Sequence, residues 1–116
     1  MSNSNFRFKQ FTINQEACAM KVGTDSVMLG AWANVPDVDE DKINILDIGT
    51  GTGILSLMMA QRYEKANIVA IDCDLDAIKQ ARENFDSSQY ADRITTSHCL
   101  IQDFQSLHLY DAIICN

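Results

Sequence analysis

The residues best suited to chemistry lie in the stretch LDIGTGTG, which places Asp47, Gly49, Gly51 and Gly53 at alternate positions. The apolar run INILDI is typical of a buried strand, and glycines directly after a strand let a ligand approach the backbone where the next helix begins. Asp72 follows 23 residues after Gly49, at the end of a second apolar run, NIVAID. A carboxylate there can accept hydrogen bonds from both hydroxyl groups of a ribose. Together these features predict a site for an adenosine-containing ligand at the carboxyl edge of a sheet.

Two other interpretations compete for the glycine pattern. A dinucleotide-binding loop requires glycine at the third position after Gly51, and that position is Ile54, which weakens a nicotinamide cofactor as the ligand. A tight turn without any ligand explains the glycines alone. It does not explain why Asp47 and Asp72 stand at the ends of the two predicted strands.

Alternating strand and helix patterns position these residues. The run ILSLMMAQRY predicts a compact apolar helix, and RITTSH and DAIIC predict a third and a fourth strand. Asp74 can cap a further helix, in which Leu75, Ile78, Ala81 and Phe85 share one apolar face. Strands that alternate with helices pair in parallel through right-handed crossovers. The predicted fold class is therefore α/β, with a doubly wound sheet.

The N-terminal part has a different pattern. FRFKQFTI alternates as a short strand does, and the apolar stretch DSVMLGAWA predicts a helix that opens at Thr24 and Asp25. Trp32 is expected in the core, on an apolar face with Met28 and Leu29. The acidic segment PDVDEDK predicts a surface linker, so we expect residues 1–40 and 41–116 to be separate parts of the chain.

Composition narrows the class of protein. A chain of 116 residues holds one domain, and it contains neither the apolar core of a signal peptide nor a membrane-length apolar run, so a cytoplasmic location is expected. Four scattered cysteines without a CxxC pair indicate reduced, buried thiols, and no metal site is expected. The net charge of −7 disfavours a whole-surface nucleic-acid platform. A polyanion would meet the N-terminal segment, which carries three basic and two acidic side chains in residues 1–30, or parts outside this sequence.

The motifs of the glycine loop and the predicted strands resemble those of a known family. ILDIGTGTGIL followed by VAIDCD resembles the first two motifs of the class I S-adenosylmethionine-dependent methyltransferases, and DAIICN resembles the strand that leads into their Asn-Pro-Pro-Tyr motif. The resemblance implies S-adenosylmethionine as cofactor and a Rossmann-like, three-layer sheet, here with the parallel order 3-2-1-4 and truncated after strand 4. The family fold continues with three more strands. We therefore expect a fragment that exposes an edge and an apolar face, does not catalyse, binds cofactor weakly or not at all, and self-associates through strand 4.

The N-terminal stretch indicates which methyltransferases within this class the chain resembles. FRFKQFTINQEACAMKVGTDSVMLGAWA resembles the opening of the bacterial tRNA(Val) adenine-N6 methyltransferases, which implies that the full-length enzyme methylates N6 of an adenine in tRNA. In that family residues like 1–40 pack over the cofactor. Two alternatives stay open. One is a sister methyltransferase acting on a protein glutamine or a ribosomal RNA guanine, which the KVGTD block disfavours. The other is a non-catalytic nucleotide-binding module, which a lack of methyl transfer to tRNA would favour.

The resemblance also implies roles for single residues. Asn116 would be catalytic, because in the family the Asn side-chain oxygen and the next Pro carbonyl accept hydrogen bonds from the two N–H groups of the adenine amine and favour its nucleophilic form. Asp47 would order the loop near the methionine ammonium, and Asp72 would hold the ribose. Relatives commonly place an Asp for the adenine amine where this chain has Leu100, which leaves Asp103 as the nearest acid. The implied cofactor-binding residues are Lys21, Thr24, Asp47, Gly49, Thr50, Gly51, Gly53, Asp72, Cys73, Leu100 and Ile101, with Asp25 near the methionine end.

Overall fold

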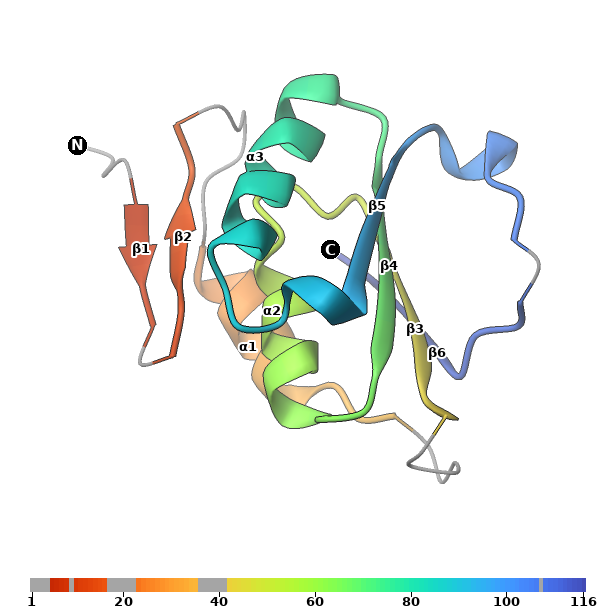
Figure 1. The fold of residues 1–116 in the computed structure, drawn as a ribbon, viewed down its shortest axis with the longest axis horizontal. Coiled ribbons are helices and arrows are strands. Elements are labelled where there is room, and N and C mark those ends of the chain that lie inside the picture. Colours follow the sequence, from red (N-terminus) through yellow and green to blue (C-terminus); the bar gives the residue numbers. More distant parts are fainter. Residues whose placement is uncertain (1–4, 9, 17–22, 36–41, 107) are drawn as a thin grey trace.

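The computed structural model (Figure 1) describes residues 5–8, 10–16, 23–35, 42–106 and 108–116. Lys21, Cys18 and most of the predicted linker lie outside the described residues. The helices and strands are β1 (Asn5–Arg7), β2 (Thr12–Asn14), α1 (Thr24–Trp32), β3 (Asn44–Ile48), α2 (Ile54–Arg62), β4 (Asn67–Asp72), α3 (Leu75–Asp86), β5 (Ile94–His98) and β6 (Ala112–Cys115). Two 3-10 turns, Ala91–Arg93 and Ile101–Asp103, flank β5.

The main sheet has the order β5-β4-β3-β6, with all neighbours parallel. Along the chain, this order places the predicted third, second, first and fourth strands side by side. The register pairs Asp47 with Ala70, and Ile48 with Cys115. Since parallel strands end at one edge, the residues after β3, β4 and β6 meet there. The predicted α/β class with a parallel sheet is confirmed.

All three helices lie on one face of this sheet (Figure 1). The resemblance predicts a third layer of helices on the opposite face, and the described residues contain no helix there. Among the described residues, only the segment between β5 and β6 flanks that face. On that face Leu46 and Ile71 are buried, but Ile113, next to Leu46 in the register, is 63% exposed. The expected exposed apolar face is thus found at β6 and not across the whole sheet.

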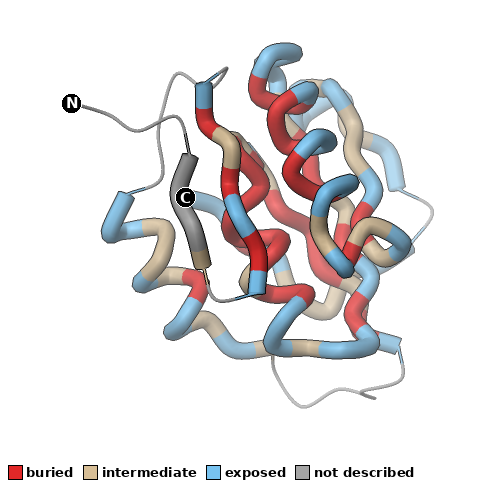
Figure 2. The backbone as a smooth tube through the Cα atoms, turned by 60° about the vertical axis from the view of Figure 1, so that its left-hand side comes forward, coloured by how far each residue is buried: buried red, intermediate tan, exposed pale blue. Residues whose placement is uncertain are grey.

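Figure 2 shows the buried residues gathered in the middle of the molecule, and the core cluster joins the sheet to α2 and α3. Ile45, Ile68 and Ile114 from the sheet are buried there, together with Leu57 of α2 and Phe85 of α3. Burying side chains of this size stabilises the fold by about 1.5–3 kcal/mol each. The core therefore fixes α2 and α3, and with them the turns that connect both helices to the carboxyl edge.

The predicted N-terminal strand is in fact two strands. β1 and β2 form an antiparallel hairpin in which Phe6 pairs with Ile13, and the amide of Phe8 donates to the carbonyl of Phe11 at 2.7 Å in the turn. Phe11 and Ile13 are buried. Alternation alone cannot separate one strand from a tight hairpin, because both place every second side chain on the same face.

The prediction that Trp32 belongs to the core is wrong. Helix α1 forms where it was expected, but Trp32 is 79% exposed and Met28 is 63% exposed. The helix instead packs through Gly30, where an added Cβ would approach Met58 Cε to 2.9 Å. Leu75, the first residue of α3, is also exposed, unlike the other three residues of its predicted apolar face.

The cysteines also depart from expectation. Cys73 and Cys115 are exposed and Cys99 is half-buried, each as a free thiol, so the prediction of buried thiols is wrong for two of the three described cysteines. Within the described ranges, no cluster of three His, Cys, Asp or Glu side chains is arranged to hold a metal ion. None of the helices in these ranges is long and apolar enough to cross a membrane.

Candidate functional site

The glycine loop between β3 and α2 adopts a backbone that only glycine takes readily. Gly49, Gly51 and Gly53 have φ values of +70°, +56° and +89°. A Cβ at Gly49 or Gly51 would meet nothing within 4 Å, whereas one at Gly53 would lie 2.7 Å from Phe85 Cζ. The first two glycines therefore border open space at the edge of the sheet, and the third permits close packing of the loop on α3.

Four amide groups of this loop are already hydrogen-bonded within the protein. Gly49 and Thr50 both donate to the carbonyl of Ile71 at 2.9 Å, and Gly53 donates to the carbonyl of Thr50 at 2.8 Å. The amide of Gly51 donates to Asp72 Oδ2 at 2.9 Å. The loop is thus tied to the end of β4 at several points. Because these four amides are already used as donors, the main contribution of the loop to a ligand site is the open space along its backbone.

Asp72 connects the glycine loop with the start of α3. Its Oδ2 accepts from Gly51, and its Oδ1 accepts from the amide of Asp74 at 2.9 Å. Asp74 caps α3 as predicted, since its side chain accepts from the amide of Asp76. Each carboxylate oxygen has a second lone pair, and the half-buried Asp72 retains acceptor capacity toward the edge of the sheet.

Asp47 is fully buried beneath the loop. Its Oδ2 accepts from Thr50 Oγ1 and from Ser56 Oγ, both at 2.8 Å, which orders the loop on the first turn of α2. Its Oδ1 has no hydrogen-bond partner among the described residues. Burial raises the pKa of Asp47 to about 6, against the hydrogen bonds from Ser56 and Thr50, and the nearby charge of Asp72 raises it further. The site therefore contains a buried carboxylate with an unused acceptor atom.

The raised pKa of Asp47 leads to a pH-dependent stability. The folded state holds the proton of Asp47 more tightly than the unfolded chain, so its contribution is greatest below about pH 4 and is lost as the pH rises to about 6. The loss amounts to about 3 kcal/mol. In the full-length protein, Asp47→Asn should therefore gain stability relative to the unchanged protein by about this amount between pH 4 and pH 7.

Urea unfolding of both proteins across this pH range measures the difference directly. Comparing the two proteins at each pH cancels the titration of every other carboxylate. If the difference in free energy of unfolding stayed constant from pH 4 to pH 7, the pKa of Asp47 would not be raised and the buried carboxylate would carry no such cost.

The first turn of α1 reaches the same edge of the sheet. Asn116, directly after β6, donates from its Nδ2 to Ser26 Oγ at 2.6 Å. Thr24 and Asp25 stand in the same helical turn and are exposed. The structure thus brings the start of α1 together with Asn116, while Lys21 cannot be placed because it lies outside the described residues.

The residues after β4 and β5 form the far side of this edge. Cys73 is exposed, and its carbonyl lies 3.0 Å from His98 Nε2. The amide of Cys99 donates to the carbonyl of Asp72 at 3.0 Å, which holds the two strand ends together. Leu100 and Ile101 are 45% and 46% exposed, and Asp103 is exposed in the 3-10 turn Ile101–Asp103. The positions are compatible with a border for an adenine ring, and this role stays a prediction.

Several residues that shape the site were missed by the sequence analysis. Asn84 of α3 accepts from the amide of Asn14 at 2.7 Å and donates to the carbonyls of Asn14 and Thr52, both at 2.8 Å, so it joins β2 to the glycine loop. Asn84 lies three residues after Ala81, on the predicted buried face of α3, and a polar residue on a buried face indicates a structural hydrogen bond. Ser56, a polar residue in an apolar run, was another signal of this kind. Ser26 gave no local signal.

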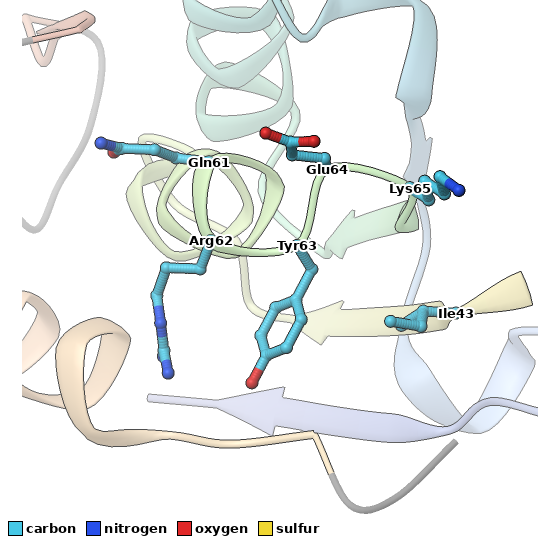
Figure 3. A pocket seen from close by; sticks show the side chains of 6 residues that line it. All are labelled: Ile43, Gln61, Arg62, Tyr63, Glu64 and Lys65. Carbon is cyan, nitrogen blue, oxygen red and sulfur yellow. The ribbon is translucent and has the colours of Figure 1, made fainter. Parts of the chain in front are cut away.

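A pocket of about 370 Å³ lies elsewhere in the molecule (Figure 3). It is found at the amino ends of β3 and β4, where the amide of Asn67 donates to the carbonyl of Ile43. The pocket is therefore at the edge opposite the glycine loop. Its lining residues are Ile43, Gln61, Arg62, Tyr63, Glu64 and Lys65.

Known proteins resemble this chain over nearly its whole length. The tRNA1(Val) (adenine(37)-N6)-methyltransferase of Dyadobacter fermentans is 55% identical over 114 residues, which are 98% of this chain and 46% of that protein. The protein of the same name from Phocaeicola vulgatus is 53% identical over 116 residues, or 100% of this chain and 47% of that protein. This chain spans about half the length of the curated relatives that it matches.

One solved structure and one family model that are similar to this chain also belong to methyltransferases. The plantazolicin methyltransferase BpumL, solved in complex with SAH, is 26% identical with a TM-score of 0.55, and the match covers 63% of this chain and 26% of that one. Residues 24–116 match the family of the methyltransferase small domain. The matched range includes the glycine loop, Asp72 and Asn116. The resemblance to methyltransferases inferred from the motifs is confirmed: this chain belongs to the methyltransferase small domain family.

Proposed function

We propose that this chain is the cofactor-binding part of an S-adenosylmethionine-dependent methyltransferase that modifies N6 of an adenine in tRNA. The observation that carries this proposal is the convergence of the glycine loop, Asp72 and Asn116 at one edge of the sheet. The names of the relatives from D. fermentans and P. vulgatus support the tRNA substrate. The SAH bound to the plantazolicin methyltransferase supports the cofactor.

The described residues fit this cofactor. Gly49 and Gly51 leave open space beside the loop, and the carboxylate of Asp72 can accept hydrogen bonds from ribose hydroxyl groups. The buried carboxylate of Asp47 beneath the loop would favour a cationic group such as an ammonium nearby through its charge. Thr50, Cys73, Leu100 and Ile101 would border the adenosine, and Thr24 with Lys21 would close the methionine end. Residues 1–40 would pack over the cofactor site, and residues 41–116 would form the cofactor-binding half of the methyltransferase domain.

When bound, S-adenosylmethionine supplies a methyl group on a positively charged sulfur, which a nucleophile displaces without acid or base assistance. The contribution of the protein is alignment and electrostatics. The side-chain oxygen of Asn116 would accept a hydrogen bond from an N–H group of the adenine amine, which localises the nitrogen lone pair and stabilises the charge that develops on nitrogen. The same edge of the sheet would hold both reactants, so that the amine faces the methyl group.

The function is tested by supplying the full-length protein with unmodified tRNA and S-adenosylmethionine that carries a labelled methyl group. After digestion to nucleosides, the label is expected in N6-methyladenosine. Label in a guanine, or in the glutamine of a protein substrate, would point to a sister methyltransferase. If no substrate were labelled, the site would be a nucleotide-binding module without catalysis. A cytoplasmic location, where tRNA is modified, is part of the proposal.

The 116-residue chain on its own is expected to self-associate through β6. Among the described strands, β6 pairs only with β3, and Ile113 is 63% exposed next to this open edge. An uncovered strand edge beside apolar side chains favours pairing with another chain. In sedimentation experiments, the isolated chain should be dimeric or larger, and Ile113→Lys should shift it toward monomer. A monomer that unfolds cooperatively without any substitution would contradict this expectation.

A further inference from the structure

Ser26 and Asn116 are ninety residues apart in the chain and yet share a hydrogen bond of 2.6 Å. Ser26 is half-buried in the first turn of α1, and Asn116 is exposed at the end of β6. We propose that the hydroxyl group of Ser26 orients the side-chain amide of Asn116 for methyl transfer. Ser26 would then be a positioning residue, and this inference rests on the function proposed above.

Orientation matters because the two ends of a carboxamide have opposite hydrogen-bonding roles. The oxygen accepts, whereas the NH₂ group donates. The adenine amine presents N–H donors, so only the oxygen of Asn116 can bind it, and a reversed amide would place donor against donor. In the structure Nδ2 of Asn116 donates to Ser26 Oγ, so the oxygen Oδ1 is not the atom that binds Ser26. The hydroxyl of Ser26 thus occupies the end of the amide that the reaction does not use.

Both residues are held in place relative to the glycine loop. Asn116 follows the ladder between β3 and β6, in which Ile48 pairs with Cys115, and the loop starts directly after Ile48. Ser26 belongs to helix α1, which is regular up to its last turn, because the backbone amide of Ala33 donates to the carbonyl of Leu29.

Helix α1 is in turn fixed to α2, which begins directly after the loop. Gly30 packs closely on Met58, and Arg62 of α2 donates to the carbonyls of Gly30 and Ala33. The hydrogen bond between Ser26 and Asn116 therefore closes a ring of contacts that runs through α1, α2, the loop, β3 and β6. A side chain held in such a frame retains its geometry more precisely than one on a free strand end.

The test is a substitution at Ser26 in the full-length protein, with methyl transfer to unmodified tRNA as the readout. Ser26→Ala should lower kcat by about tenfold, the effect of losing one hydrogen bond, with an unchanged KM for S-adenosylmethionine. Ser26→Thr keeps the hydroxyl group and should restore kcat. Ser87→Ala removes a hydroxyl at the far end of α3, where it donates to the carbonyl of Glu83, and should leave kcat unchanged.

A double substitution separates positioning from a general effect on structure. If Ser26 acts through Asn116, then Ser26→Ala should cause no further loss of kcat in a protein that already carries Asn116→Ala. An independent loss would overturn the inference, as would an unchanged kcat in Ser26→Ala or a failure of Ser26→Thr to restore activity. An inactive unsubstituted protein would instead overturn the proposed function, so the two failures are distinguishable.

Discussion

Asn116→Ala in the full-length protein should lower the rate of methyl transfer by about 10²–10³-fold, the usual effect of removing one group that stabilises developing charge. Asn116 lies beyond β6 at the carboxyl edge of the sheet, where the strand pairs with β3 directly before the glycine loop. The hydrogen bond from the amine to its oxygen would be strongest in the transition state, when positive charge develops on the attacking nitrogen. The loss should therefore appear in kcat, with an unchanged affinity for S-adenosylmethionine.

The matched control is Asn67→Ala. Asn67 is the same residue type at the start of β4, at the opposite edge of the sheet, and is exposed. It should leave both kcat and cofactor affinity unchanged. If Asn116→Ala weakened cofactor binding and kcat at saturation stayed the same, Asn116 would contact the cofactor rather than the substrate, and its proposed role would be wrong.

Two glycines of the loop should respond differently to the same substitution. Gly53→Ala is expected to destabilise the full-length protein by about 2–5 kcal/mol, because a φ of +89° disfavours alanine and the new Cβ collides with the ring of Phe85. Gly51→Ala should cost only about 1–2 kcal/mol, since its Cβ enters open space. That space is the proposed ligand site, so Gly51→Ala should weaken S-adenosylmethionine binding about tenfold or more.

Denaturant unfolding and cofactor titration of both variants provide the measurement. The expected pattern is a large stability loss at Gly53 and a large affinity loss with a folded protein at Gly51. Each variant is the control for the other, because both place alanine at a positive φ in the same loop. Equal effects on stability, with cofactor affinity retained by Gly51→Ala, would show that the open space beside Gly51 is not used by the ligand.

Local patterns in the sequence predicted the four strands of the main sheet, their parallel pairing and the glycine loop, whereas the order of the strands came from the family resemblance. Apolar runs that end in a carboxylate or glycine located β3 and β4, and the alternation of strands with helices indicated parallel pairing. The three alternate glycines form the predicted turn between β3 and α2, and the structure adds that all three adopt a positive φ. The cap of α3 by Asp74 is likewise a local feature, set by residues two positions apart.

The features that the sequence did not predict depend on contacts between distant elements. After its polar first turn, helix α1 is apolar on all sides from Val27 to Trp32, so its periodicity cannot indicate which side packs on α2. Trp32 was therefore wrongly expected in the core. The bond between Ser26 and Asn116 depends on the placement of α1, α2 and the sheet together. No spacing in the sequence encodes such a contact, and the same is true of the link between Asn84 and β2.

The central claim is that the carboxyl edge of this sheet binds S-adenosylmethionine with its methyl group toward Asn116. A crystal structure of the full-length protein with S-adenosylhomocysteine tests it most directly. We expect the ribose hydroxyl groups on Asp72, the amino-acid end of the ligand beside the glycine loop near Asp47, and the sulfur facing Asn116. A ligand bound away from this edge, or with its ribose out of reach of Asp72, would show that this edge is not the cofactor site.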